Sequence, residues 1–162
     1  MKKIFKIIIL TALVLALSIS FCGCAWLKQI FTPNTNPNIN LDPNGGNHGT
    51  PNPPANNAGG GVAIPGWSVI TIPAGQTEVT VDLPNPGANQ DKYYLSFEMR
   101  MADTGEVLFT TGYVKPGESI NKVTLSRPLE AGQYNVIIRV QPCRADGSLT
   151  NNADMSTILI VK

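Results

Sequence analysis

Apolar and polar residues alternate with a period of two from Val62 to the C-terminus, and this pattern constrains the fold more than any other feature. Residues 93–101 show it best, because every second residue is apolar: Tyr93, Leu95, Phe97, Met99 and Met101. The residues between them are mostly polar, as in a strand with one buried face. No helix of ten residues is readable after residue 62. The pattern therefore predicts an all-β domain over residues 62–162.

Turn signals rich in Pro, Gly, Asp and Asn divide this region into short strands. Seven strands are expected, at residues 68–72, 78–83, 93–101, 107–111, 120–125, 134–141 and 155–161. Seven short strands with this spacing predict an antiparallel, immunoglobulin-like sandwich. A small antiparallel barrel is the structural alternative.

The first 23 residues have the composition of a secretory signal peptide. Three lysines precede an apolar run, residues 7–21, and small residues follow it. The end of the run resembles a bacterial lipobox, in which a cysteine receives diacylglycerol and becomes the new N-terminus. Gly23 has the small size needed before that cysteine. The resemblance implies lipidation at Cys24 and a membrane anchor facing outside the cytoplasm.

Two alternatives to lipidation stay open. Gly23, Cys24 and Ala25 also form a small-x-small pattern, which ordinary signal peptidase would cleave after Ala25. The third possibility is an uncleaved signal anchor, although the apolar run is shorter than the roughly 20 residues of a usual membrane-spanning helix.

A segment of low complexity separates the N-terminus from the β region. Residues 32–60 contain nine Asn, six Pro and five Gly among 29 residues. Apolar residues are too sparse there to close a core, so the sequence predicts a disordered tether over residues 24–61. His48 lies in this segment without neighbouring ligand residues, and no metal site is expected there.

Charge and cysteine content narrow the classes of partner. The chain carries 12 Lys and Arg against 11 Asp and Glu, and removal of residues 1–23 leaves a net charge of −2. Nucleic acid is therefore not an expected partner, because its binders carry a concentrated basic surface. Cys143 is the only cysteine after Cys24, so an internal disulfide cannot form and a small buried apolar role is expected.

Three stretches resemble a largely uncharacterised family of small exported β domains from Gram-positive Firmicutes. They read TGEVLFTTGYVKPGESI, TLSRPLEAGQYNVIIRV and NNADMSTILIVK. The resemblance covers roughly residues 62–162 and implies an immunoglobulin-like or fibronectin-like module, without catalytic residues. Residues 129–134 also resemble the tyrosine corner of such sandwiches, in which the hydroxyl of Tyr134 would bond backbone a few residues upstream.

No catalytic, cofactor-binding or metal-binding constellation is readable in the β region. It contains no His, and its carboxylates are dispersed. Asp103 lies two residues before Gly105, and Asp146 directly precedes Gly147. Asp and Gly so placed are typical of turns rather than of calcium loops. Trp67 is expected to pack at the sandwich edge, whereas Tyr94 is expected on the exposed face.

These observations predict a non-enzymatic, membrane-anchored lipoprotein of the cell envelope that displays a binding or scaffolding domain. Its partner would be an envelope protein or a glycan that the sequence does not identify. The alternative is an inhibitor of an exported protease, which would present a rigid loop to the enzyme.

Overall fold

The computed structural model describes residues 39–48 and 61–162, which all belong to the unit Asn36–Lys162. These residues form two β-sheets and one short 3-10 helix, so the predicted all-β class is confirmed. No helix in this part of the chain has the length and apolar character needed to span a membrane. The predicted signal peptide and Cys24 lie outside the described residues.

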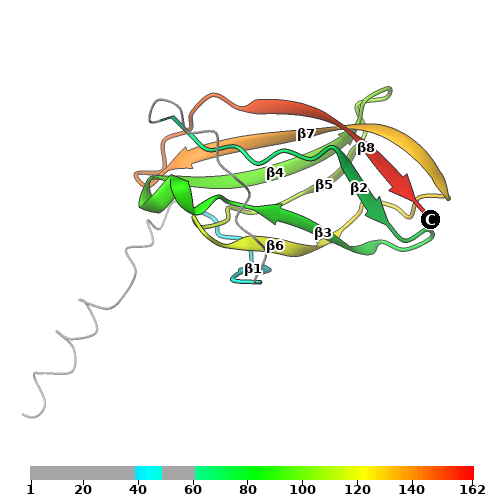
Figure 1. Ribbon diagram of the computed structural model, residues 1–162, viewed down its shortest axis with the longest axis horizontal. Coiled ribbons are helices and arrows are strands. Elements are labelled where there is room, and N and C mark those ends of the chain that lie inside the picture. The colour runs from blue at the N-terminus through cyan, green and yellow to red at the C-terminus, as the bar shows by residue number, and fades with distance from the viewer. Residues whose placement is uncertain (1–38, 49–60) are drawn as a thin grey trace, which may run out of the picture. The chain divides into compact units, whose positions relative to one another are not determined.

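The described residues contain eight strands, which Figure 1 labels in chain order. The strands are β1 (Gly45–Gly46), β2 (Val69–Ile72), β3 (Glu78–Pro84), β4 (Tyr93–Met101), β5 (Val107–Thr110), β6 (Ser119–Thr124), β7 (Gly132–Arg144) and β8 (Ala153–Val161). The 3-10 helix η1 (Gly87–Lys92) lies between β3 and β4. Strands β2 to β8 correspond to the seven strands predicted from the sequence, whereas β1 was not expected.

One sheet has the strand order β1-β6-β3 and the other has the order β2-β8-β7-β4-β5 (Figure 1). All pairs are antiparallel except β2 and β8, which run parallel with Val69 opposite Ile158. The prediction of seven purely antiparallel strands is therefore wrong in number and in one pairing. Alternation of side chains shows which face is buried but carries no information on the direction of the neighbouring strand.

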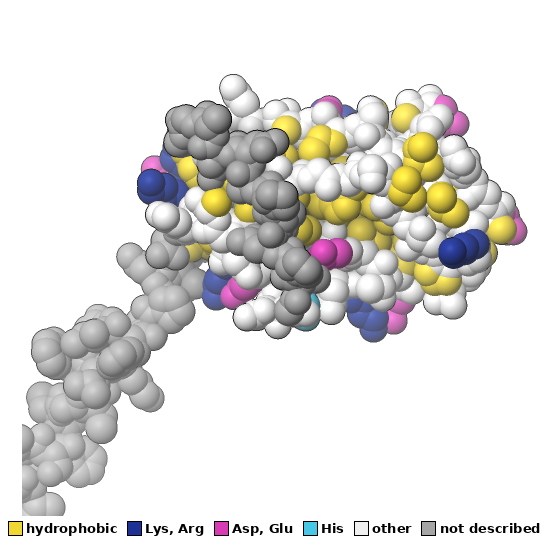
Figure 2. All heavy atoms as spheres, in the orientation of Figure 1, with side chains coloured by type: hydrophobic (Ala, Val, Ile, Leu, Met, Phe, Trp, Pro, Cys, Tyr) yellow, Lys and Arg dark blue, Asp and Glu magenta, His cyan; other side chains and the backbone are white. Residues whose placement is uncertain are grey.

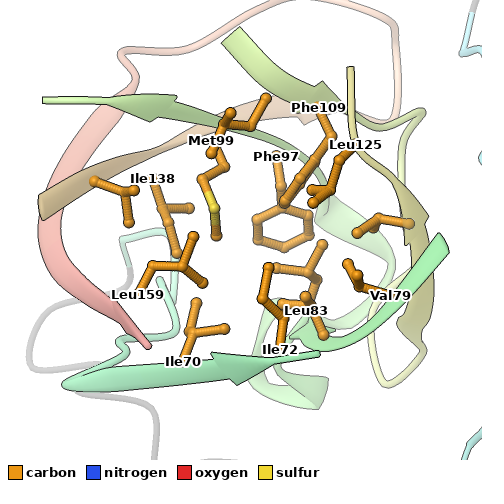
Figure 3. Close-up of a cluster of buried hydrophobic side chains, with 14 of the residues drawn as sticks. Ile70, Ile72, Val79, Leu83, Phe97, Met99, Phe109, Leu125, Ile138 and Leu159 are labelled. Atoms are coloured by element: carbon orange, nitrogen blue, oxygen red, sulfur yellow. The ribbon is translucent and has the colours of Figure 1, made fainter. Parts of the chain in front are cut away.

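Apolar side chains from both sheets form one continuous core (Figure 3). Phe97 and Met99 of β4 and Ile138 of β7 face Leu83 of β3 across the space between the sheets. Four of the residues predicted to point inward on β4, Leu95, Phe97, Met99 and Met101, are each at most 7% exposed. The period-two pattern arises because each strand turns one face toward this core.

Residues 39–48, called here the docked segment, pack against this domain. The backbone N–H of Asp42 donates to the carbonyl of Tyr113 at 2.9 Å, and the N–H of Tyr113 donates to the carbonyl of Asn40 at 2.8 Å. A few residues later β1 pairs with the start of β6, with Gly46 opposite Ser119. The prediction of a disordered tether is therefore wrong for these ten residues, because backbone pairing supplies contacts that composition does not reveal.

Candidate binding surfaces

Tyr134 stands near the start of β7, where the sequence predicts a tyrosine corner. Its hydroxyl donates a 2.9 Å hydrogen bond to the carbonyl of Glu130, four residues upstream. The ring is half-buried and packs against the edge of the main core. Leu129, one residue before Glu130, is 1% exposed. The geometry is that of the predicted corner, and it ties the loop before β7 to the strand itself.

Trp67 packs at the edge of the core, as the sequence predicts. Its indole ring meets Phe97 edge to face, with ring centroids 5.9 Å apart and planes at 87°. The indole N–H donates to the backbone carbonyl of Asp82 at 2.8 Å. Because ring and N–H are both engaged within the domain, Trp67 links the segment before β2 to both sheets.

Tyr94 is not exposed, contrary to the prediction. It points away from the main core, but it is only 9% exposed because Ile39 of the docked segment covers it. Cys143, its register partner on β7, lies in the same small cluster, and Leu41 and Tyr113 pack around it. Sequence alternation correctly placed Tyr94 on the outer face but could not show that Ile39, far upstream in the chain, returns to that face.

Cys143 is 2% exposed and is a free thiol. Burial raises its pKa, the negative charge of Asp146 adds to the rise, and a hydrogen bond with Tyr113 opposes it. A raised pKa keeps the thiol protonated and poorly nucleophilic. The predicted small buried apolar role therefore fits its surroundings.

The segments that begin at Asp103 and Asp146 form turns. The N–H of Ser148 donates to Oδ1 of Asp146 at 2.8 Å, and the N–H of Thr104 donates to Oδ1 of Asp103 at 2.8 Å. Gly147 has φ +87°, a conformation that glycine adopts without steric cost. Among the described residues no three His, Cys, Asp or Glu side chains gather closely enough to hold a metal ion.

His48 ends the docked segment. Its Nε2 is 3.1 Å from the carbonyl oxygen of Asn44, so the imidazole closes a local turn. Burial raises the pKa of Asp82, and the charge of His48 opposes this rise. The side chain therefore contacts the segment itself and lies near β3, the strand that carries Asp82.

Asn85 and Asn89 form a buried polar network that sequence reasoning missed. Each is 1% exposed. Asn89 accepts a 2.7 Å bond from the N–H of Ala63 and donates to the carbonyls of Ala63, at 2.9 Å, and of the Asn85 side chain, at 2.6 Å. Asn85 in turn donates to the carbonyls of Tyr93, at 2.9 Å, and of Val114, at 2.8 Å. The network joins three loops at one end of the domain.

Charged side chains lie in small groups of mixed sign, as the face in Figure 2 shows. In one group Arg139 binds both carboxylate oxygens of Asp154, at 2.7 and 2.8 Å, and Arg100 binds the same carboxylate at 2.7 Å. The hydrogen bond from Arg139 lowers the pKa of Asp154. These pairs brace the outer faces of β4, β7 and β8.

Three large apolar side chains are exposed: Val69 at 48%, Val107 at 42% and Leu149 at 62%. Val69 and Val107 lie on β2 and β5, the two edges of the five-stranded sheet. Leu149 lies in the loop between β7 and β8. Exposed apolar groups on edge strands are suited to contact with another chain. The edge of β5 is partly occupied, because the N–H of Ser126 donates to the carbonyl of Leu108 at 2.7 Å.

The described domain has two open hollows of about 380 Å³ each. One is lined by Met101, Ala102, Asp103, Gln133, Tyr134 and Asn135. The other is lined by Lys92, Tyr93, Arg144, Ala145 and Asp146.

Comparison of the chain with protein-family models, with curated proteins and with solved structures finds no match.

Proposed function

We propose that this chain is a bacterial membrane lipoprotein, anchored through lipid on Cys24, that displays one immunoglobulin-like sandwich outside the cytoplasm. The domain serves as a non-enzymatic binding or scaffolding module of the cell envelope. The observation that carries the binding role is the position of Val69 and Val107, which expose large apolar side chains at both edges of the five-stranded sheet.

The immunoglobulin-like interpretation is supported by strand order. Strands β3 and β6 pair in one sheet, as the second and fifth strands of that fold do. Strands β4, β7 and β8 are neighbours in the other sheet, as its third, sixth and seventh strands are. The bond from Tyr134 to Glu130 adds the corner at the expected strand. The domain departs from antibody domains in lacking their pair of cysteines.

The anchor leads to a prediction that does not depend on the domain. Cells given radiolabelled palmitate should incorporate label into the wild-type chain but not into Cys24→Ala, because the acyl groups need the thiol and the amine of that cysteine. The measurement is autoradiography of the immunoprecipitated protein. Equal labelling of both proteins would remove Cys24 as the lipid site, and Cys22→Ala is the matched control that should keep its label.

Contact through the sheet edges predicts where a partner can be trapped. A photo-crosslinking residue placed at Val69 or Val107 in the full chain should give an adduct in intact cells, since a partner strand added at either edge would lie within reach of the side chain on that edge. Thr124, exposed on the central strand β6, is the control position and should give none. Adducts of equal yield at all three positions would contradict an edge-specific interface.

The second candidate is an inhibitor of an exported protease, and Leu149 is the observation that favours it. This residue is 62% exposed on a loop held firmly at both ends. The N–H of Arg144 donates to the carbonyl of Ser148 at 2.8 Å, and the side chain of Gln141 donates to the carbonyl of Thr150 at 2.7 Å. A crosslinker at Leu149 that traps a protease, with none trapped at Val69 or Val107, would favour this function instead.

A further inference from the structure

The docked segment is held by a carboxylate as well as by backbone pairing. Asp42 accepts a 2.8 Å bond from the N–H of Gly112 through Oδ2, and a 2.8 Å bond from the N–H of Asn44 through Oδ1. The first bond fixes the segment to the domain, and the second fixes the turn that leads into β1. Both oxygens of one side chain therefore determine where the segment lies.

The domain has a matching feature at Gly112. A Cβ atom at this position would lie 2.7 Å from the backbone nitrogen of Asp42, 2.8 Å from its Cα and 3.0 Å from the carbonyl oxygen of Asn40. Real Cβ atoms do not approach backbone so closely, and these nearest neighbours all belong to the docked segment. The absence of a side chain at Gly112 is thus a condition for docking rather than for the fold of the β-sheets.

Apolar contacts complete the docking site. Ile39 is 8% exposed and covers Tyr94 and Cys143, with Leu41 and Tyr113 at the margin of the same cluster. This cluster is separate from the main core. Segments held by few apolar contacts and a short ladder open at a lower free energy than the strands beneath them.

We propose that the docked segment sets how far the domain reaches from the membrane, with a short reach when it is docked and a long reach when it is released. The proposal rests on the anchor at Cys24 given above. In the docked state the chain between the anchor and the domain consists of residues 25–38, which can extend at most about 50 Å. On release it consists of residues 25–60, which can extend at most about 125 Å.

Under this proposal, the parts of the chain before and after the docked segment contribute differently to the reach. Residues 25–38 separate the anchor from the domain in both states, whereas residues 49–60 add to the reach only when Asp42 leaves Gly112. A partner that pulls on the domain, or that binds Tyr94 and Cys143 in place of Ile39, would favour the extended state. The domain could then contact targets at two different heights above the bilayer.

Gly112→Ala tests the proposal, because it blocks docking from the domain side without altering the segment. Gly66→Ala is the matched control, since a Cβ at Gly66 meets nothing within 4 Å. Hydrogen exchange of the full chain should show the amides of Asp42 and Tyr113 exchanging at least tenfold faster in Gly112→Ala, with the amides of β4 and β7 unchanged. Asp42→Ala, which removes the carboxylate from the segment side, should give the same result.

Reach is measured on the same proteins, purified from the membranes of the cells that made them and mixed with phospholipid vesicles. Energy transfer from a dye at the C-terminus to acceptor lipids should fall about twofold in Gly112→Ala and stay at the wild-type value in Gly66→Ala. Labelling of Cys143 by N-ethylmaleimide, followed at the peptide level, should become at least tenfold faster as Ile39 leaves.

The outcomes separate this proposal from the lipoprotein function. A wild-type chain that does not associate with vesicles, while exchange still shows docking, would overturn the lipid anchor and with it the role in reach. Faster exchange in Gly112→Ala without a fall in energy transfer would overturn the role in reach alone. Unchanged exchange in both Gly112→Ala and Asp42→Ala would overturn the docking site itself.

Discussion

Replacing Asn85 with alanine should lower the free energy of unfolding by about 3 kcal/mol or more. The side chain is 1% exposed, and it donates to the carbonyls of Tyr93 and Val114 and accepts from the side chain of Asn89. A buried polar group that loses its partner costs about 1–3 kcal/mol. Alanine would remove a bond from each of these three groups, of which the carbonyl of Val114 would keep another one, the 3.2 Å bond from the N–H of Leu95.

Urea denaturation of a fragment spanning 36–162, which contains the docked segment and the β region, measures this loss as a shift in midpoint. Asn151→Ala is the matched control, because Asn151 is exposed in a loop and should change stability by less than about 0.5 kcal/mol. Asn85→Asp should be more harmful than Asn85→Ala, since it would turn a carboxylate oxygen toward two carbonyl oxygens. A loss below about 1 kcal/mol for Asn85→Ala would show that water replaces the side chain.

The sequence was a good guide to the strands and a poor one to this network. Each of β2 to β8 has one face in the core, so alternation marks it directly. Asn85 lies in Pro84-Asn85-Pro86-Gly87, which predicts a turn, and the chain does turn into η1 there. Turn composition gives no sign that an asparagine points inward, because its partners are backbone carbonyls that every residue type carries.

The docked segment was missed for a related reason. Composition indicated a tether, and a core was not expected from two apolar residues. The alternation of Ile39 and Leu41 before Asp42-Pro43-Asn44-Gly45 was a usable signal, since the structure contains an isolated β-bridge between Leu41 and Tyr113, followed by a turn. What the sequence could not provide was the receiving surface, because Tyr113 and Gly112 become neighbours of the segment only in the folded domain.

The immunoglobulin-like interpretation and the exposed edges lead to different tests. Strand order and the tyrosine corner concern architecture, and this architecture is compatible with many activities. The proposed binding roles depend instead on Val69, Val107 and Leu149, which are exposed, apolar and on edges or loops. Neither strand alternation nor composition separates such residues from the many apolar residues in the core, so the exposed positions become visible only in the structure.

Truncation of Tyr134 is the second large effect that we expect. Tyr134→Ala should cost about 2–3 kcal/mol, less than the 3–5 kcal/mol typical of a fully buried aromatic residue, because this ring is only half-buried. Tyr134→Phe keeps the ring and removes only the bond to the carbonyl of Glu130. That carbonyl belongs to an exposed residue and stays accessible to water, so the expected loss is about 0.5–1 kcal/mol.

Comparison of the two variants separates the contribution of the Tyr134 ring to stability from that of its hydroxyl. Denaturation of both in the 36–162 fragment should give midpoints in the order wild type, Tyr134→Phe, Tyr134→Ala, with slopes that stay equal. Gln133→Ala, at an exposed neighbouring position on β7, is the control and should match the wild type within about 0.5 kcal/mol. If Tyr134→Phe cost as much as Tyr134→Ala, the hydroxyl would carry the whole effect. If Tyr134→Ala unfolded at the wild-type midpoint, the ring would contribute nothing and the start of β7 would not depend on the corner.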